Sequence, residues 1–88
     1  MNTAILLLLL SSNPTYTKDI KPIFKSRCKI CHNKYSPDRN WMNYDKAYEK
    51  RALIKLRIEN KSMPPGDMPI TDEERQLIIK WIDTGAKK

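Results

Sequence analysis

Glycine, cysteine and histidine are all scarce in this chain. Of its 88 residues, 2 are glycine, 2 are cysteine and 1 is histidine. Two cysteines cannot build a framework of several disulfides, and so little glycine beside 6 prolines argues against a long disordered linker. Acidic residues are outnumbered as well, since 17 Lys and Arg stand against 10 Asp and Glu, which gives a net charge of +7. This balance excludes an acidic calcium-binding type of protein and favours an acidic or anionic partner.

A single apolar run, from Ala4 to Leu10, opens the chain. It is too short for a membrane-spanning helix, which needs about 20 residues. It resembles the apolar part of a secretory signal peptide, although no Lys or Arg precedes it and only Ser11 and Ser12 stand where a cleavage site would be. We expect residues 1–12 to be a signal-like or anchoring segment that can hold the chain at a membrane surface. The alternative is a strand or helix that belongs to the fold.

The remaining domain, residues 13–88, lies near the lower size limit at which an apolar core is sufficient by itself. A disulfide, a metal or a prosthetic group is therefore expected to stabilise it. Its apolar residues predict three helical stretches and no strand. The first covers residues 18–29, where Thr17 can cap the helix and Ile20, Phe24 and Cys28 share one face. Pro22 is tolerable there because it falls near the first turn.

The other two predicted helices lie on either side of a proline-rich loop. Residues 44–60 carry an apolar stripe that includes Ala47 and Ile54, while residues 62–69 contain three prolines and a glycine and cannot form a regular element. Thr71 and Glu74 have the spacing of a capping box and predict the start of the last helix. Gly85 is expected to end that helix. Its apolar stripe consists of Leu77, Ile78, Trp81 and Ile82.

The chemistry is indicated by Cys28-Lys29-Ile30-Cys31-His32, which is the C-x-x-C-H signature of covalent c-type haem attachment. Two thiols at this spacing reach the two vinyl groups on one edge of the porphyrin. The imidazole that follows the second cysteine is then carried beneath the iron, where it becomes the proximal ligand. The motif therefore predicts one haem c per chain, held by Cys28, Cys31 and His32.

Other uses of a C-x-x-C pair fit less well. A thioredoxin-like redox pair requires a preceding strand within a βαβ pattern, and none is predicted here. A structural zinc site requires four ligands, but Cys28, Cys31 and His32 are the only Cys and His in the chain. A disulfide between the two cysteines would close too small a loop to stabilise the domain much.

Because His32 is the only histidine, a second histidine of the same chain cannot bind the iron. The usual alternative is a methionine thioether, which favours the reduced iron. Met63 and Met68 both stand in the proline-rich loop, whose stiff backbone would present a long side chain with little entropy to lose. We predict Met63 as the distal ligand, with Met68 as the second candidate and packing in the haem pocket as the role of the other.

At this point the chain resembles the small single-haem domains of the class I c-type cytochromes. Residues 15–24, followed by the attachment motif, look like the opening of one branch. Residues 40–44 plus a helix are similar to its middle, and residues 63–66 followed by Trp81-Ile82 and Gly85-Ala86 look like its close. The resemblance covers about residues 15–86. It implies an all-α fold of three or more helices wrapped around one covalently bound haem, with N- and C-terminal helices crossing, His32 below the iron and Met63 above it.

With both axial positions filled, the iron has no open site for a substrate, so we expect a one-electron carrier and not an enzyme. Two alternatives remain: an open-site haem protein with peroxidase or gas-sensing activity, and a haem subunit of a larger electron-transfer assembly. The resemblance implies attachment outside the cytoplasm, so we expect a periplasm or an equivalent exported compartment. No base-reading motif accompanies the spread positive charge, which argues against nucleic acid.

The expected partners are redox proteins with acidic docking patches. Basic residues stand both beside the attachment motif and on the second predicted helix, although many of them are also explained as ordinary solvated surface. They are Lys25, Arg27, Lys29 and Lys34 near the motif, and Lys46, Lys50, Arg51, Lys55 and Arg57 on the helix. Trp41 and Tyr44 are candidates for donating hydrogen bonds to the haem propionates, with packing as their alternative role.

Overall fold

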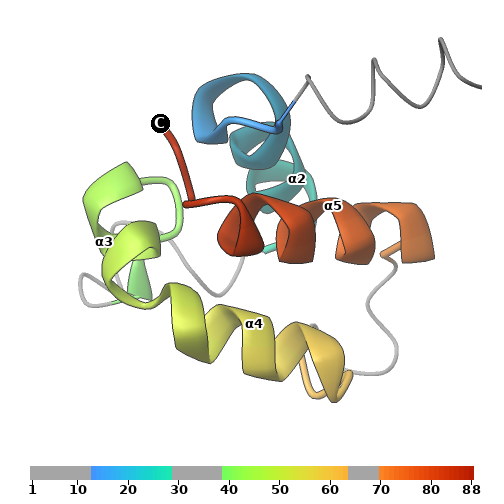
Figure 1. The fold of residues 1–88 in the computed structure, drawn as a ribbon. Helices are drawn as coiled ribbons and strands as arrows, with labels where there is room; N and C mark the ends of the chain where they lie inside the picture. Colours follow the sequence, from blue (N-terminus) through green and yellow to red (C-terminus); the bar gives the residue numbers. More distant parts are fainter. Residues whose placement is uncertain (1–12, 29–38, 64–69) are drawn as a thin grey trace, which may run out of the picture.

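A computed structural model describes residues 13–28, 39–63 and 70–88. Within these ranges the chain forms only helices and turns, and no strand occurs (Figure 1). The elements are a π-helical turn η1 (Tyr16–Ile20) and the α-helices α2 (Lys21–Arg27), α3 (Tyr44–Glu49), α4 (Arg51–Glu59) and α5 (Asp72–Asp83). The predicted all-α class is confirmed.

The first helical region begins before the predicted start at Lys18. The hydroxyl that caps it belongs to Thr15, whose Oγ1 accepts from the backbone N–H of Lys18 at 3.3 Å. The predicted cap, Thr17, is wrong, because this residue lies inside η1 and its N–H donates to the carbonyl of Lys88 at 2.9 Å. Pro22 stands in the first turn of α2, as predicted.

The predicted helix over residues 44–60 is two helices. Lys50, with φ −100° and ψ 16°, separates α3 from α4. The side chain of Asn43 caps α3 by accepting from the N–H of Lys46 at 3.1 Å. No glycine or proline marks the bend in the sequence, so the local pattern gave no reason to expect it.

The last helix follows the prediction at both ends. Glu74 N–H donates to Thr71 Oγ1 at 3.0 Å and Thr71 N–H donates to Glu74 Oε1 at 2.9 Å, which completes the capping box. At the other end Gly85 adopts φ +108°, a left-handed conformation that glycine accepts without steric cost. Ala86 N–H then donates back to Trp81 O at 2.7 Å, closing a Schellman turn.

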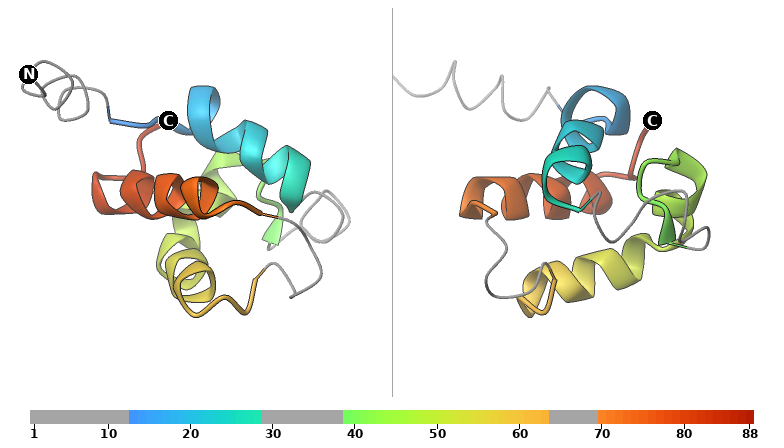
Figure 2. Two further views of the ribbon diagram at one scale, coloured as in Figure 1. Left: turned by 90° about the vertical axis from the view of Figure 1, so that its right-hand side faces the viewer. Right: turned by 180° about the vertical axis from the view of Figure 1, so that it is seen from behind.

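The core forms where η1 and α2 lie across α5 (Figures 1 and 2). Tyr16 and Phe24 place their rings 6.0 and 6.3 Å from the ring of Trp81. Ile20 and Ile78 are fully buried beside them. This is the crossing of N- and C-terminal helices that the family resemblance implies. The buried hydrophobic residues are Tyr16, Ile20, Ile23, Phe24, Trp41, Ala47, Ile54, Ile58, Ile78, Trp81 and Ala86.

The three residues after Gly85 connect three helical regions through their carbonyl oxygens. Lys87 O accepts from Tyr16 N–H and from the indole N–H of Trp81, both at 2.8 Å. Ala86 O accepts from the hydroxyl of Tyr44 at 2.7 Å. Figure 2 shows the C-terminus beside the start of η1. Residues 86–88 are therefore part of the packed structure.

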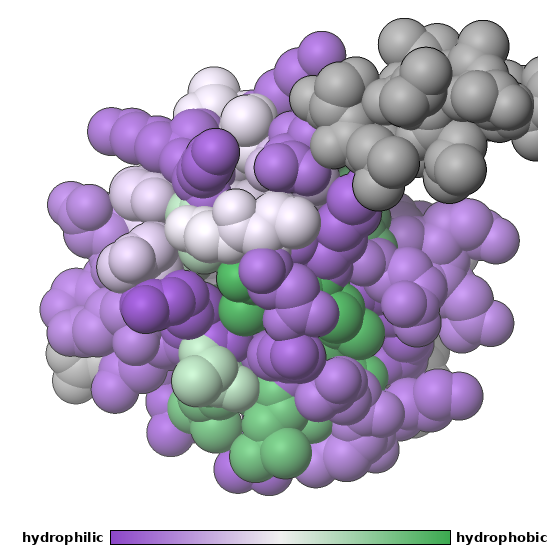
Figure 3. Space-filling view, viewed as in Figure 1, coloured by the Kyte–Doolittle hydropathy of each residue, from purple (hydrophilic) through white to green (hydrophobic). Residues whose placement is uncertain are grey.

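The face of the molecule seen in Figure 3 is mostly hydrophilic, with a smaller apolar area over α4 and α5. Leu56 of α4 contributes to the exposed apolar surface, because 52% of it is accessible to solvent. None of the helices in the described ranges has the length and apolar character that crossing a membrane requires. The apolar run at the start of the chain lies outside these ranges.

Candidate haem-binding site

Cys28, the first residue of the attachment motif, stands directly after α2. Its backbone N–H donates to Phe24 O at 2.8 Å and so continues the hydrogen bonding of the helix. The residue is half-buried and packs against the hydrophobic core. The thiol is thus carried by a helix end that Phe24 anchors in the core, as the shared face of Ile20, Phe24 and Cys28 predicted.

A salt bridge fixes this helix end to α5. Arg27, the neighbour of Cys28, lies with Nε 3.2 Å from Oε1 of Glu74. Burial alone would raise the pKa of Glu74, but the N–H of Thr71 and the Arg27 guanidinium outweigh it and lower the pKa below its ordinary value. Glu74 therefore stays ionised at neutral pH, and its charge stabilises the contact between the end of α2 and the start of α5. Arg27 is one of the basic residues near the motif, and this ion pair gives it a structural role.

Met63, the predicted distal ligand, follows a Schellman turn at the end of α4. Ser62 N–H donates to Arg57 O at 3.1 Å and Lys61 N–H donates to Ile58 O at 3.3 Å. The N–H of Met63 also donates to Arg57 O, at 3.2 Å. Met63 is half-buried, and its backbone is tied to α4 although it opens a proline-rich stretch.

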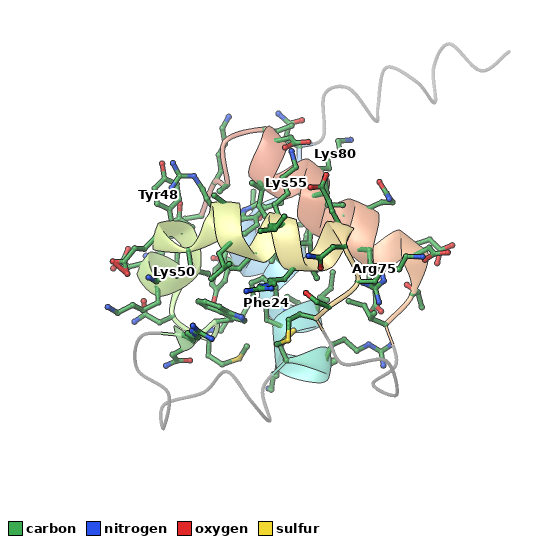
Figure 4. All side chains as sticks on the ribbon, turned by 90° about the horizontal axis from the view of Figure 1, so that it is seen from below. Phe24, Tyr48, Lys50, Lys55, Arg75 and Lys80 are labelled. Atoms are coloured by element: carbon green, nitrogen blue, oxygen red, sulfur yellow. The ribbon has the colours of Figure 1, made fainter. Side chains whose placement is uncertain are left out.

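Arg75 of α5 contacts the backbone carbonyl of Met63. Its Nη1 donates to Ile58 O at 3.2 Å and to Met63 O at 3.5 Å. Figure 4 shows Arg75 where α4 and α5 lie beside each other. Since Glu74 and Arg75 are adjacent, the segments that carry Cys28 and Met63 converge on the first turns of α5. Sequence reasoning did not single out Arg75, and nothing in its sequence context distinguishes it from the other cations.

The remaining predicted site residues, Cys31, His32 and Met68, lie outside the described residues, so their roles stay predictions. Tyr44 uses its hydroxyl proton on Ala86 O, which favours the packing role over donation to a propionate. Trp41 is buried, and its carbonyl accepts from the Tyr16 hydroxyl at 2.6 Å.

The described side chains fit a covalent haem. A thiol at the end of α2 and a thioether on a segment bonded to Arg75 of α5 are the donor types that attachment and soft axial ligation require. Partly buried apolar side chains also pack against the core, among them Met42, Ile70 and Leu77. In the described part of the chain no group of three or more His, Cys, Asp or Glu side chains could hold a metal ion.

Comparison with protein families agrees with this geometry. Residues 15–87 match the family described as PccH cytochrome c. The chain therefore belongs to the PccH cytochrome c family, and its all-helical fold is a cytochrome c fold. Membership implies a covalently bound haem c and haem-based electron transfer, and such proteins are typically electron carriers rather than enzymes. No curated protein and no solved structure matches the chain.

Proposed function

We propose that the protein is a monohaem one-electron carrier in which Cys28 and Cys31 hold the haem and His32 and Met63 are the axial ligands. The observation that carries this proposal is the convergence of the Cys28 and Met63 segments on the same turns of α5, through Glu74 and Arg75. When bound, haem iron stores one electron by cycling between its ferric and ferrous states. The role of the polypeptide is to hold the two axial ligands, His32 and Met63, at the iron.

The distal ligand is tested with Met63→Ala beside Met68→Ala, both produced in a host that attaches haem. The weak far-red absorption band of ferric haem reports an iron–methionine bond. Met63→Ala is expected to abolish this band, to lower the reduction potential and to let the ferrous protein bind carbon monoxide rapidly, while Met68→Ala retains the band. The reverse pattern would assign Met68. A wild-type protein without the band that binds carbon monoxide rapidly would support the open-site alternative.

The number of haems is tested by the intact mass of the purified protein. One haem linked through Cys28 and Cys31 gives the polypeptide mass plus one haem, and that mass survives acid denaturation because thioether bonds are covalent. Cys28→Ala is expected to weaken the covalent link, and the double variant Cys28→Ala, Cys31→Ala to eliminate it. A mass equal to the bare polypeptide would overturn the proposal.

Redox proteins with acidic docking patches are the proposed partners. Lys55 lies 2.6 Å from Asp83, and Arg51 lies 4.0 Å above the ring of Tyr48, so these two cations already have partners within the chain. The exposed Arg57 and Lys61 are better placed to attract an acidic surface. The test is the salt dependence of the bimolecular electron-transfer rate, which should fall as ionic strength rises and fall less steeply for Arg57→Gln.

An exported compartment, such as a periplasm, is the proposed location, with residues 1–12 as the signal-like or anchoring segment. The N-terminal sequence of the mature protein after expression distinguishes a cleaved segment from a retained one. Fractionation of the producing cells then separates the compartments. Haem-loaded protein found only in the cytoplasm would contradict this location. Size-exclusion mass measurement separates a free shuttle from a subunit of a larger assembly.

A further inference from the structure

The guanidinium of Arg75 bridges two backbone carbonyls, one inside α4 and one in the segment that follows it. Ile58 O lies in the last turn of α4, whereas Met63 O follows the Schellman turn. Both bonds come from Nη1, whose two N–H groups can each donate to a different carbonyl. The charge of the guanidinium also lies at the negative pole of α4, where a cation is stabilised. Arg75 is half-buried, so solvent competes less for its N–H groups than at a fully exposed site.

Met63 is consequently held on both sides of its Cα. On one side its N–H donates to Arg57 O at 3.2 Å, and on the other its carbonyl accepts from Arg75 at 3.5 Å. The side chain leaves the backbone between these two groups, so they fix the point from which the thioether extends. The first bond lies within one continuous segment of the chain. Only the second connects Met63 to α5.

We propose that Arg75 is a positioning residue for the distal ligand, acting through the carbonyl of Met63. This inference rests on the proposed function, because it requires that Met63 bind the iron. By holding the Met63 backbone, Arg75 lowers the entropy that the chain loses when the thioether binds. Without Arg75 the thioether dissociates from the iron more often, although His32 and the covalent attachment are unchanged.

The chain provides a matched control for the loss of a cation between the same two helices. Lys55 of α4 forms a salt bridge with Asp83 of α5 at 2.6 Å. Figure 4 shows Lys55 and Arg75 at separate positions along the α4–α5 pair. The hydrogen bonds of Met63 run to Arg57 and Arg75 and not to Lys55, so Lys55→Gln removes a link between α4 and α5 and leaves these bonds in place.

The experiment compares haem-loaded wild type, Arg75→Gln, Arg75→Lys and Lys55→Gln. We measure the far-red band of the ferric protein as temperature rises, the rate of carbon monoxide binding to the ferrous protein, and the urea midpoint of unfolding. Arg75→Gln is expected to lose the band at a lower temperature and to bind carbon monoxide about threefold faster, the scale of one long and therefore weak hydrogen bond. Arg75→Lys keeps the charge and several N–H donors on a side chain one atom shorter, so it should lie between wild type and Arg75→Gln.

Lys55→Gln is expected to lower the urea midpoint slightly and to leave the band and the carbon monoxide rate unchanged. The inference is overturned when Arg75→Gln changes the band and the rate no more than Lys55→Gln does. If Arg75→Gln fails to fold, Arg75→Lys decides by the same comparison. Met63→Ala separates the two proposals: a band that survives Met63→Ala refutes the ligand assignment, whereas a band lost in Met63→Ala but unchanged in both Arg75 variants refutes only the positioning role.

Discussion

The hydroxyl of Tyr16 donates a 2.6 Å hydrogen bond to the carbonyl oxygen of Trp41. Both residues are buried, at 3% and 5% exposure, and in the sequence one precedes and the other follows the attachment motif. The bond therefore joins two residues between which the whole attachment motif lies in the sequence. It also satisfies a backbone carbonyl that solvent cannot easily reach.

Tyr16→Phe is predicted to lower the free energy of unfolding by about 1–3 kcal/mol, because it removes the hydroxyl that donates to the buried carbonyl of Trp41. Urea unfolding of the haem-loaded protein measures the change. Tyr48→Phe is the control: Tyr48 is 38% exposed, so its free energy of unfolding should change by no more than about 0.5 kcal/mol. Equal urea midpoints for Tyr16→Phe and wild type would show that the bond does not stabilise the fold.

The same tyrosine predicts a loss of stability at high pH. Burial raises the pKa of Tyr16 from 10.0 to about 12. The folded state thus favours the neutral phenol, whereas the unfolded chain ionises it from about pH 10. The stability from this group is complete below pH 10 and is lost as the pH rises towards 12. The free energy of unfolding is expected to fall by on the order of 2–3 kcal/mol over this pH range.

Urea unfolding of wild type and Tyr16→Phe, below pH 10 and again near pH 12, isolates this contribution. The variant has no phenol at position 16 to ionise, so the gap in stability between the two proteins should narrow as the pH rises. A gap of constant size over that range would mean that the ionisation of Tyr16 is not linked to folding.

Glu74 predicts the opposite behaviour, at low pH. The pKa of Glu74 is lowered below its ordinary value of 4.5 although burial opposes this, because Thr71 and Arg27 stabilise the charged form. Its contribution is present above pH 4.5 and is lost as the pH falls through the lowered pKa. Glu74→Gln should therefore cost about 1 kcal/mol at neutral pH and show a flatter decline of stability in acid. Thermal or urea unfolding across that range measures both effects.

Glu73→Gln is the matched control for this prediction. Glu73 lies in the same first turn of α5 and is exposed, so the substitution removes the same charge from the same helix end. Its effect should be limited to the interaction with the helix dipole, a few tenths of a kcal/mol. Equal losses for Glu73→Gln and Glu74→Gln would mean that the contacts with Thr71 and Arg27 contribute nothing measurable.

The sequence predicted those features that local pattern determines. The cap at Thr71, the end of α5 at Gly85 and the burial of Phe24 and Trp81 follow from spacing within a few residues, and the structure confirms them. Cys28 packs against the core on the predicted face, although α2 ends at Arg27, before the predicted end of the helix at residue 29. Within the described ranges, α5 is the helix for which local signals predicted both ends.

Pairings between distant segments were not predictable in this way. Tyr16 with Trp41, Arg27 with Glu74 and Arg75 with Met63 depend on how the helices pack, and no periodicity encodes them. The chain has 17 Lys and Arg, and sequence alone does not show which of them turns inward to a carbonyl. The bend at Lys50 belongs with these features, since it has no breaker residue.

Lys61 offers a prediction of increased stability near the proposed ligand. It adopts φ 61° in the Schellman turn after α4, a left-handed conformation that costs a residue with a Cβ roughly 1–2 kcal/mol. Glycine relieves that cost, although it also gains freedom in the unfolded chain. Lys61→Gly should therefore raise the free energy of unfolding by about 0.5–1 kcal/mol. The urea midpoint of the haem-loaded protein measures the gain.

Lys61→Ala separates the backbone effect from the loss of charge. Alanine removes the same ammonium but keeps the Cβ, so it should give no increase in stability, and a small decrease because a cation near the C-terminus of α4 is lost. If alanine stabilises as much as glycine, relief of like-charge repulsion in this +7 chain is the cause instead of the left-handed conformation. In Lys61→Gly the far-red band should persist, because the bonds that hold Met63 run to Arg57 and Arg75 and not to the Lys61 side chain.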